Sequence, residues 1–297
     1  MSASKSSLKV AVAQIETALG DLPRNLRKHL DVISSARTAG HAVLVFPELS
    51  LVGHGAGTDV PRLALSGNAR ELALLAEASG EMLTIAGFIE EAPGALYYNS
   101  AAALQGGRVV FCHRKVNLAT YGRLEDGKHY AAGRRIDVVD VGRPWRAGVL
   151  ICSDLWNPPL VHIAAVRGAT LLLAPISSAK EAMCAEFDNP SAWEVNAKFH
   201  AMTYGFFLAL ANRTGTEGDL TFWGGSRILD AFGRTLAAAK GAGEELVSAV
   251  LDYELVRRAR YLLPTVRDAS PGLLARELGR AARDLDCRTT EPDFSDA

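Results

Sequence analysis

The sequence predicts an α/β protein in which strands and helices alternate. Leu8–Ile15 alternates apolar and small polar residues as a strand does, and a helical apolar stripe follows within Pro23–Arg37. Ala42–Phe46 is then a short, fully apolar strand, and Pro61–Ala78 has the spacing of a second amphipathic helix. This order of strand, helix, strand, helix is typical of α/β folds.

The next part of the chain predicts strands and one long loop. Met82–Ile89, Tyr97–Leu104 and Arg108–His113 are strand-like runs, and we expect the last two to form a hairpin across Gly106-Gly107. The polar segment Lys115–Gly133 is too long for a routine connection. Because long ordered loops are often functional, this segment is a candidate for part of a site.

The second half of the chain repeats the alternation. Its predicted elements are strands at Ile136–Val141 and Trp145–Ile151, a helix at Leu160–Arg167, a strand at Thr170–Pro175, a helix at Ser191–Tyr204, and strands at Gly205–Ala211, Ser226–Asp230 and Leu246–Asp252. After Tyr253 the chain becomes helical and highly charged, and it does so again across Leu273–Arg283. We expect the polar end, Arg288–Ala297, to be loose.

Composition and charge exclude several classes of function. The 297 residues are 48% hydrophobic and 22% charged, so the chain can bury a full core, and nothing marks a boundary inside it. The net charge of −1 gives no field that attracts nucleic acid or an anionic membrane, so we expect a small ligand. Four widely spaced cysteines predict reduced thiols and neither a metal site nor a disulfide. With no signal peptide or membrane span, we expect a cytoplasmic protein.

The run Val149–Pro158 carries the first candidate for catalysis. A buried strand ends on Cys152, and polar residues and two prolines follow. The carboxyl end of a strand is where α/β folds place their chemistry, and backbone N–H groups of the turn would lower the pKa of the thiol and hold an oxyanion. The alternative is an inert core cysteine, since free cysteine is often buried.

Two further predicted strands are each followed by a reactive side chain, Glu48 and Lys115. A thiolate that attacks a carbonyl or nitrile carbon needs a base for its proton, an acid for the leaving nitrogen, and a cation or donors for the oxyanion. Glu48 would be the base and then the acid. Lys115 and the backbone N–H of Ser153 would stabilise the tetrahedral intermediate.

Several separated motifs occur in one order along the chain: F-P-E-L-S-L-V-G at 46–53, R-K-V-N-L at 114–118, I-C-S-D-L-W at 151–156, A-N-R-T-G at 211–215 and F-W-G-G-S at 222–226. With them the sequence resembles the nitrilase (carbon–nitrogen hydrolase) superfamily over roughly Leu8–Glu254, and its amidase-like branch in particular. The resemblance implies a four-layer αββα sandwich of two sheets with helices outside. It also implies a Glu-Lys-Cys triad at Glu48, Lys115 and Cys152 and no metal or organic cofactor.

The resemblance implies a second glutamate after the lysine, which matches Glu125. Asp126 is adjacent, and a solvated acidic pair in a loop is the alternative. Five residues near the reactive strand ends are candidates for substrate binding: Tyr121, Ser153, Trp156, Ser177 and His54. Core packing is the alternative for the aromatic residues, and packing or a surface hydrogen bond for the histidine.

The resemblance implies hydrolysis of a non-peptide carbon–nitrogen bond, in an amide or carbamoyl compound, through a thioester. The alternatives are a nitrilase, a glutaminase subunit that supplies ammonia to a partner, and a catalytically silent scaffold. The runs 115–122 and 152–158 look similar to the glutaminase domains of glutamine-dependent NAD synthetases, yet no Gly-rich phosphate loop is present. We therefore expect a free-standing amidase.

The predicted organisation is a hydrolase domain at 1–264, followed by a helical extension and loose tail at 265–297. Because family members are usually paired through helices and tails, we expect a homodimer or a higher homo-oligomer. The expected partner is a small amide or nitrile substrate, with no nucleic acid and no membrane.

Overall fold

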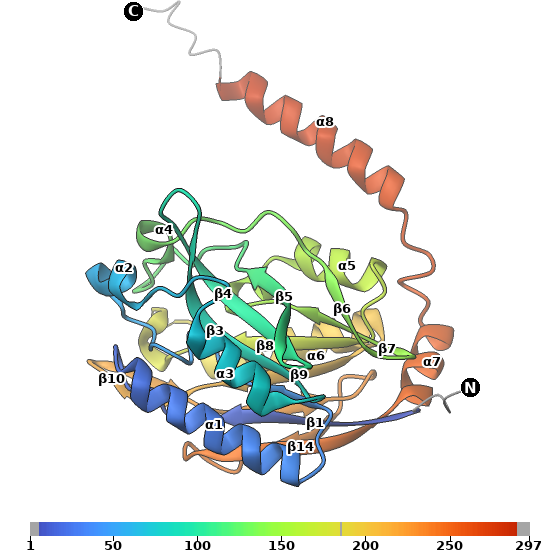
Figure 1. The fold of residues 1–297 in the computed structure, drawn as a ribbon. Coiled ribbons are helices and arrows are strands. Elements are labelled where there is room, and N and C mark those ends of the chain that lie inside the picture. Colours follow the sequence, from blue (N-terminus) through green and yellow to red (C-terminus); the bar gives the residue numbers. More distant parts are fainter. Residues whose placement is uncertain (1–5, 185, 290–297) are drawn as a thin grey trace, which may run out of the picture.

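The computed structural model describes residues 6–184 and 186–289. Two six-stranded sheets pack face to face, through contacts of β1 (Ser7–Gln14) and β2 (Val43–Val45) with β8 (Leu171–Ile176) and β9 (Phe207–Asn212). Helices lie on both outer faces (Figure 1). The predicted four-layer αββα sandwich is confirmed.

The first sheet has the strand order β14-β1-β2-β3-β4-β5. Its central strands β1, β2 and β3 are parallel, and the outer strands are antiparallel to their neighbours. The remaining strands of this sheet are β3 (Leu83–Ala92), β4 (Leu96–Gln105), β5 (Arg108–Arg114) and β14 (Glu245–Asp252). Helices α1 (Leu22–Thr38) and α3 (Arg70–Ser79) cover its outer face.

The second sheet repeats this plan with the order β13-β12-β9-β8-β7-β6. Strands β7, β8 and β9 are parallel, and the others are antiparallel to their neighbours. The remaining strands are β6 (Val138–Gly142), β7 (Trp145–Val149), β12 (Arg227–Leu229) and β13 (Thr235–Ala238). Helices α5 (Pro158–Val166) and α6 (Asn189–Tyr204) cover the outer face.

The remaining elements of the described chain lie outside the two six-stranded sheets. They are the hairpin of β10 (Thr214–Glu217) and β11 (Leu220–Trp223), the helices α2 (Val60–Leu63), α4 (Asp126–His129), α7 (Tyr253–Leu262) and α8 (Pro271–Thr289), and the 3-10 turns Gly57–Asp59, Cys152–Trp156 and Lys180–Ala182.

Strand β2 shows why the central strands are apolar at every position. Val43 and Val45 belong to the core between the sheets, whereas Leu44 belongs to the core beneath α1 and α3. A strand buried on both faces has no solvent-facing position, so the alternation of an amphipathic strand is absent. The carboxyl ends of β2, β7 and β8 are followed by Glu48, Cys152 and Ser177, which therefore lie in one region.

The predicted helix Pro61–Ala78 is wrong in its middle. The chain forms α2, leaves the helical conformation at Ala64 and enters α3 at Arg70. The Leu65 N–H donates to Ile89 O at 2.8 Å, and Leu65 O accepts from Glu91 N–H at 2.9 Å, so this residue forms an isolated parallel β-bridge with β3. The following Ser-Gly-Asn turn residues favour the break, which the apolar spacing alone did not indicate.

Three short strands were absent from the prediction: β10, β11 and β13. Each has four residues and several half-buried or exposed positions. They therefore lack the continuous apolar run by which the central strands were found.

The C-terminal part leaves the sandwich. Helix α7 packs through the buried Val256 and Ala259, whereas α8 extends away from the body (Figure 1). The predicted helix Leu273–Arg283 lies within the longer α8. The predicted division of the chain at residue 264 stays a prediction. Positions 290–297 of the predicted tail lie outside the described residues.

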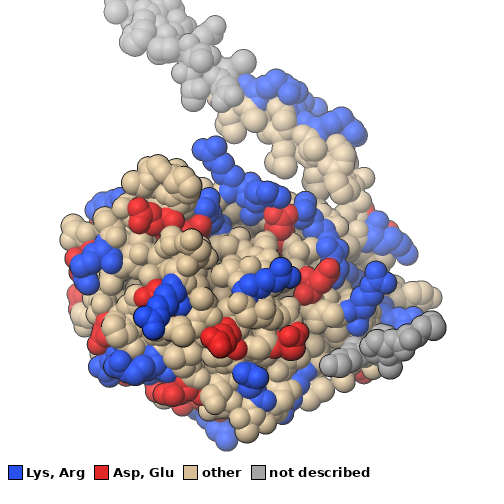
Figure 2. Space-filling model, in the orientation of Figure 1, with Lys and Arg blue, Asp and Glu red and all other residues tan. Residues whose placement is uncertain are grey.

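Figure 2 shows Lys and Arg intermixed with Asp and Glu on the visible face of the body. Across 6–184 and 186–289, no helix has the length and apolar character that a bilayer crossing requires.

Candidate active site

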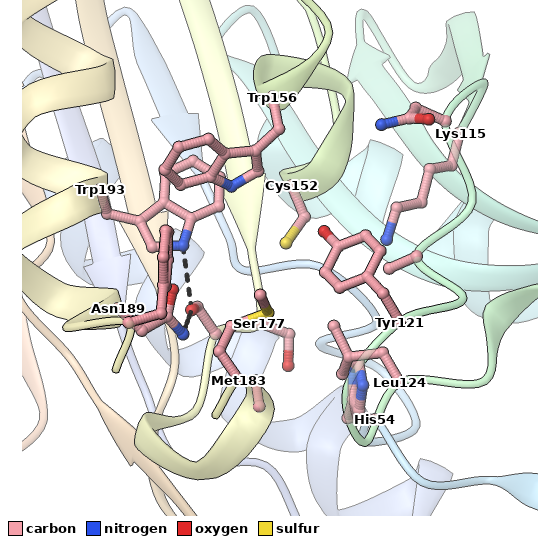
Figure 3. A pocket seen from close by; sticks show the side chains of 15 residues that line it. His54, Lys115, Tyr121, Leu124, Cys152, Trp156, Ser177, Met183, Asn189 and Trp193 are labelled. Carbon is pink, nitrogen blue, oxygen red and sulfur yellow. Dashed lines mark hydrogen bonds between the residues drawn. The ribbon is translucent and has the colours of Figure 1, made fainter. Parts of the chain in front are cut away.

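Cys152 begins a 3-10 turn directly after β7 and is buried. Its φ of 45° lies in the left-handed region, which residues other than glycine, asparagine and aspartate rarely adopt. Such strain persists only where the surrounding structure fixes it, and it occurs often at reactive residues. The turn directs the sulfur toward a pocket of about 380 Å³, named here the Cys152 pocket (Figure 3).

Glu48 lies in a tight turn after β2. A Cβ on Gly87 of β3 would lie 2.4 Å from Leu49 N and 2.6 Å from Pro47 O, so the turn approaches β3 at a place where only glycine fits. The Glu48 N–H donates to Ile176 O at 3.3 Å and connects the turn to the second sheet. The carboxylate is consequently buried at the junction of the two sheets.

Lys115 follows β5, and its ammonium lies between two buried carboxylates. Its Nζ is 2.6 Å from Glu48 Oε1 and 2.7 Å from Asp126 Oδ2. Asn99 Nδ2 also donates to Glu48 Oε1, at 2.8 Å. Burial lowers the pKa of Lys115, but the charges of Asp126 and Glu48 outweigh burial and hold this pKa well above its ordinary value. Lys115 is therefore a permanent cation at this site.

The acidic partner of Lys115 is Asp126, and the assignment of Glu125 to this place was wrong. Glu125 has 55% of its side chain exposed and pairs with Lys128 at the surface. Asp126 is buried, accepts from the Ala119 N–H at 3.2 Å and begins α4. Burial raises the pKa of Asp126, but the charges of Lys115 and His54 and the hydrogen bonds from Lys115 and the Ala119 N–H together outweigh burial and leave this pKa lowered. The sequence shows the adjacent Glu125 and Asp126, but only the backbone turn into α4 decides which of the two carboxylates faces Lys115.

We predict that Asp126→Asn lowers kcat about 100-fold or more, because Lys115 loses one of its two anions and its fixed position. Glu125→Gln is the matched control, since it removes a carboxylate one residue away that contacts only the surface Lys128 in the described part of the chain. Steady-state rates of both variants test the assignment. A larger loss in Glu125→Gln would return the role to Glu125.

Asp154 joins the nucleophile turn to the lysine segment, and the sequence did not single it out. Its carboxylate accepts from the N–H groups of Ile151, Val116 and Asn117 at 3.0, 3.0 and 2.7 Å. His113 Nε2 contacts it at 2.9 Å. One buried carboxylate thus fixes the two loops that carry Cys152 and Lys115 relative to each other.

Four predicted binding residues line the Cys152 pocket: His54, Tyr121, Trp156 and Ser177. Ser153 is not among its lining residues in the described chain, because the Ser153 hydroxyl donates to Asn117 O. The pocket also contains residues that the sequence did not indicate, chiefly Leu124, Met183, Phe187, Asn189 and Trp193. Figure 3 shows the Cys152 sulfur between Tyr121 on one side and Trp156 and Trp193 on the other.

The wall beside Tyr121 is held by a close backbone contact. Gly122 has a φ of 58°, and a Cβ there would lie 2.2 Å from Ala182 O. The Arg123 N–H donates to this same oxygen at 3.2 Å. The long loop after β5 is thereby held against the 3-10 turn Lys180–Ala182, and both segments line the Cys152 pocket.

His54 is positioned by a buried ion pair on the hairpin of β10 and β11. Glu217 accepts from the His54 N–H at 3.1 Å and the Gly55 N–H at 2.6 Å. Arg213 Nη1 lies 2.6 Å from Glu217, and its guanidinium carbon lies 4.0 Å from the centre of the Phe222 ring. The A-N-R-T-G motif therefore supports one wall of the pocket, a role that its sequence alone did not reveal.

Burial raises the pKa of the Cys152 thiol well above its ordinary value, and the charge of Glu48 adds to this effect. Lys115 and a backbone hydrogen bond from Ser177 act in the opposite direction but do not outweigh burial. The prediction that turn N–H groups lower this pKa is therefore not met. A neutral thiol at rest requires a base during attack, and Glu48 Oε2 is buried with no hydrogen-bond partner in the part of the chain described.

The sequence profile of the carbon–nitrogen hydrolase family matches residues 9–261. The chain is 30% identical over 256 residues to the glutamine-dependent NAD(+) synthetase of Thermotoga maritima, covering 83% of this chain and 42% of the synthetase. It thus spans less than half the length of that relative.

Solved structures show the same fold. A carbon–nitrogen hydrolase from Helicobacter pylori G27 superposes with a TM-score of 0.80 at 22% identity, covering 92% of this chain and 98% of the other. A mutant of the amidase from Nesterenkonia sp. AN1, with covalent addition of the acetamide moiety of fluoroacetamide at its active site cysteine, gives 0.76 at 23% identity, covering 92% and 97%.

Because the family profile covers most of the chain, the protein belongs to the carbon–nitrogen hydrolase family, within the nitrilase superfamily. It is accordingly an enzyme of the carbon–nitrogen hydrolase type. Among residues 6–184 and 186–289, no three His, Cys, Asp or Glu side chains are grouped as a metal site would need.

Proposed function

We propose that the protein hydrolyses the amide or carbamoyl C–N bond of a small molecule through a thioester on Cys152. The observation that carries this proposal is the buried contact of Lys115 with Glu48, at 2.6 Å, together with a neutral cysteine in a pocket of about 380 Å³. This arrangement supplies a nucleophile, a base and a fixed positive charge. Each has one role in acyl transfer.

In the first half-reaction, Glu48 accepts the Cys152 proton while the sulfur attacks the carbonyl carbon. The negative charge on the carbonyl oxygen is stabilised by Lys115 and the backbone N–H of Ser153. The intermediate collapses when the C–N bond breaks, and Glu48 returns its proton to the leaving nitrogen. Ammonia or an amine departs, and the acyl group stays on sulfur.

In the second half-reaction, Glu48 takes a proton from water as that water attacks the thioester. The C–S bond breaks, the thiolate recovers the proton and a carboxylic acid leaves. One water is consumed for each C–N bond cleaved, and no external oxidant or reductant is involved.

The comparisons support this proposal and also its alternatives. In a mutant of the amidase from Nesterenkonia sp. AN1, the active site cysteine carries the acetamide moiety of fluoroacetamide, so the cysteine of that amidase acts as a nucleophile, as proposed here for Cys152. Similarity to a glutamine-dependent synthetase favours a second candidate, release of ammonia from glutamine for a partner enzyme. Cys152 could also attack a nitrile carbon, with Glu48 as the base and Lys115 as the nearby cation.

We also propose two kinds of binding partner, a small-molecule substrate and further copies of the same chain. A small-molecule substrate is supported by the size of the Cys152 pocket. A homo-oligomer is supported by exposed apolar side chains on two helices, namely Phe199 and Met202 on α6 and Leu278 and Leu285 on α8. Apolar surface of this kind favours contact with another protein surface.

The test is ammonia release from a mixed panel of amides, carbamoyl compounds and nitriles, with mass spectrometry of acid-quenched enzyme. We expect ammonia from amides or carbamoyl compounds and an acyl group on the peptide that contains Cys152. Enzyme alkylated beforehand at Cys152 is the control and should release none. Turnover of nitriles alone would replace the proposal with a nitrilase, and turnover without an adduct would remove the thioester.

A further inference from the structure

The Cys152 pocket has an apolar, aromatic wall. Trp156 lies edge-to-face against Trp193, with ring centres 5.0 Å apart at 68°, and against Phe187 at 5.9 Å and 67°. Met183 and Leu124 line the same pocket. Figure 3 shows the two tryptophans on the side of Cys152 opposite Tyr121. A substrate that reaches Cys152 therefore lies beside aromatic surface.

The same pocket lacks a free charge. Among its described lining residues, Lys115 is the one Lys, Arg, Asp or Glu, and its ammonium already pairs with Glu48 and Asp126. The other polar lining residues are neutral amides or hydroxyls, apart from His54. They can hydrogen-bond a neutral group but cannot balance a full charge.

Charged side chains in the neighbouring loops are engaged elsewhere. Glu181 accepts from the Thr221 N–H at 2.7 Å, and Arg123 pairs with Asp219 at 2.6 Å on the surface. Asp188 accepts from the Ser191 N–H at the start of α6. These three side chains, and Lys180 and Glu186 in the same loops, are not among the described lining residues of the Cys152 pocket, so they do not supply a counter-ion at its wall.

We propose that the substrate is an amide whose acyl part is uncharged and carries an aromatic ring, and that free amino acids with a side-chain amide, such as glutamine, are poor substrates. This inference rests on the proposed function and names its substrate class. A zwitterionic head group would lose its hydration in the pocket without gaining a charged partner, which is strongly unfavourable. An aromatic ring gains burial and edge-to-face contacts with Trp156, Trp193 and Phe187.

A matched series of three amides tests the inference: 3-phenylpropanamide, pentanamide and glutamine. Pentanamide has the five-carbon chain of glutamine's amide without its two charges, so it separates the effect of charge from that of the ring. We expect kcat/KM, measured by ammonia release, to be highest for the phenyl compound and about 100-fold or more lower for glutamine. Pentanamide should lie between them.

Two variants locate the selectivity. Trp156→Leu should reduce the preference for 3-phenylpropanamide over pentanamide about tenfold, because the ring loses an aromatic neighbour. Phe199→Leu changes an aromatic residue that is 48% exposed on α6 and lies outside the lining of the Cys152 pocket, so the preference should remain.

The outcomes separate the inference from the proposed function. If kcat/KM for glutamine equals that for pentanamide, the inference is overturned while hydrolysis by Cys152 stands. The same holds if kcat/KM for 3-phenylpropanamide is no higher than that for pentanamide. If ammonia is released neither from these three amides nor from any amide or carbamoyl compound of the wider panel, and Cys152 carries no acyl group, the proposed function itself fails. An unchanged preference in Trp156→Leu would contradict the assigned aromatic wall.

Discussion

Replacing Cys152 with alanine is expected to lower kcat for amide hydrolysis by about 10⁵-fold to 10⁶-fold, and Glu48→Gln by about 10³-fold or more. The two residues act as one unit, because burial keeps the Cys152 thiol protonated and Glu48 must take its proton. The double variant should therefore be no slower than Cys152→Ala alone. Steady-state and single-turnover ammonia release measure these losses.

The pH dependence distinguishes a base from a structural residue. In Glu48→Gln the thiol must ionise without help, and its folded pKa is raised, so residual kcat should increase about tenfold for each pH unit between 7 and 9. The wild type should show no such increase, because Glu48 accepts the proton during attack. Asn99→Ala is the control, since it removes a neutral donor to Glu48 and keeps the carboxylate. A pH-independent residual rate in Glu48→Gln would contradict the role of base.

The sequence predicted best what depends on local pattern. The central strands β2, β7 and β8 are apolar throughout because both faces are buried, so their ends could be found, and Glu48 and Cys152 directly follow such ends. Lys115 could likewise be placed after the hairpin of β4 and β5. Composition and periodicity are sufficient for features of this kind.

Features that depend on loop conformation could not be predicted. Asp126 and Glu125 are neighbours of similar chemistry, and only the turn into α4 places one beside Lys115 and the other in solvent. Asp154 binds three backbone N–H groups from two separate segments, which leaves no periodic signal. The raised pKa of Cys152 likewise follows from the depth of burial and not from the turn sequence.

Replacing Lys115 with methionine is expected to lower the free energy of unfolding by about 3–5 kcal/mol and to abolish measurable turnover. The substitution leaves the carboxylates of Glu48 and Asp126 buried together without the ammonium that lies 2.6 and 2.7 Å from them. An uncompensated buried charge costs far more than the ion pair contributes. Urea unfolding followed by fluorescence and circular dichroism measures the loss.

The dependence of this loss on pH has a definite sign. In the wild type the pKa of Asp126 is lowered, so its contribution to stability is present above the unfolded value and is lost as pH falls through the folded one. The pKa of Lys115 is raised, so its contribution is lost only as pH rises through the folded value. Between pH 5 and 9 the pairing of Asp126 with Lys115 should therefore not make the free energy of unfolding of the wild type depend on pH.

In Lys115→Met, burial without a counter-ion raises the pKa of Asp126, so the variant loses stability as pH rises. The difference from the wild type should accordingly be larger at pH 9 than at pH 5. Adding Asp126→Asn should recover part of the stability, because one of the two buried charges is removed. Lys128→Met is the control and should leave unfolding nearly unchanged, since Lys128 is 63% exposed and pairs with Glu125 at the surface. A pH-independent loss in Lys115→Met would mean that packing of the lysine side chain, and not its charge, stabilises the site.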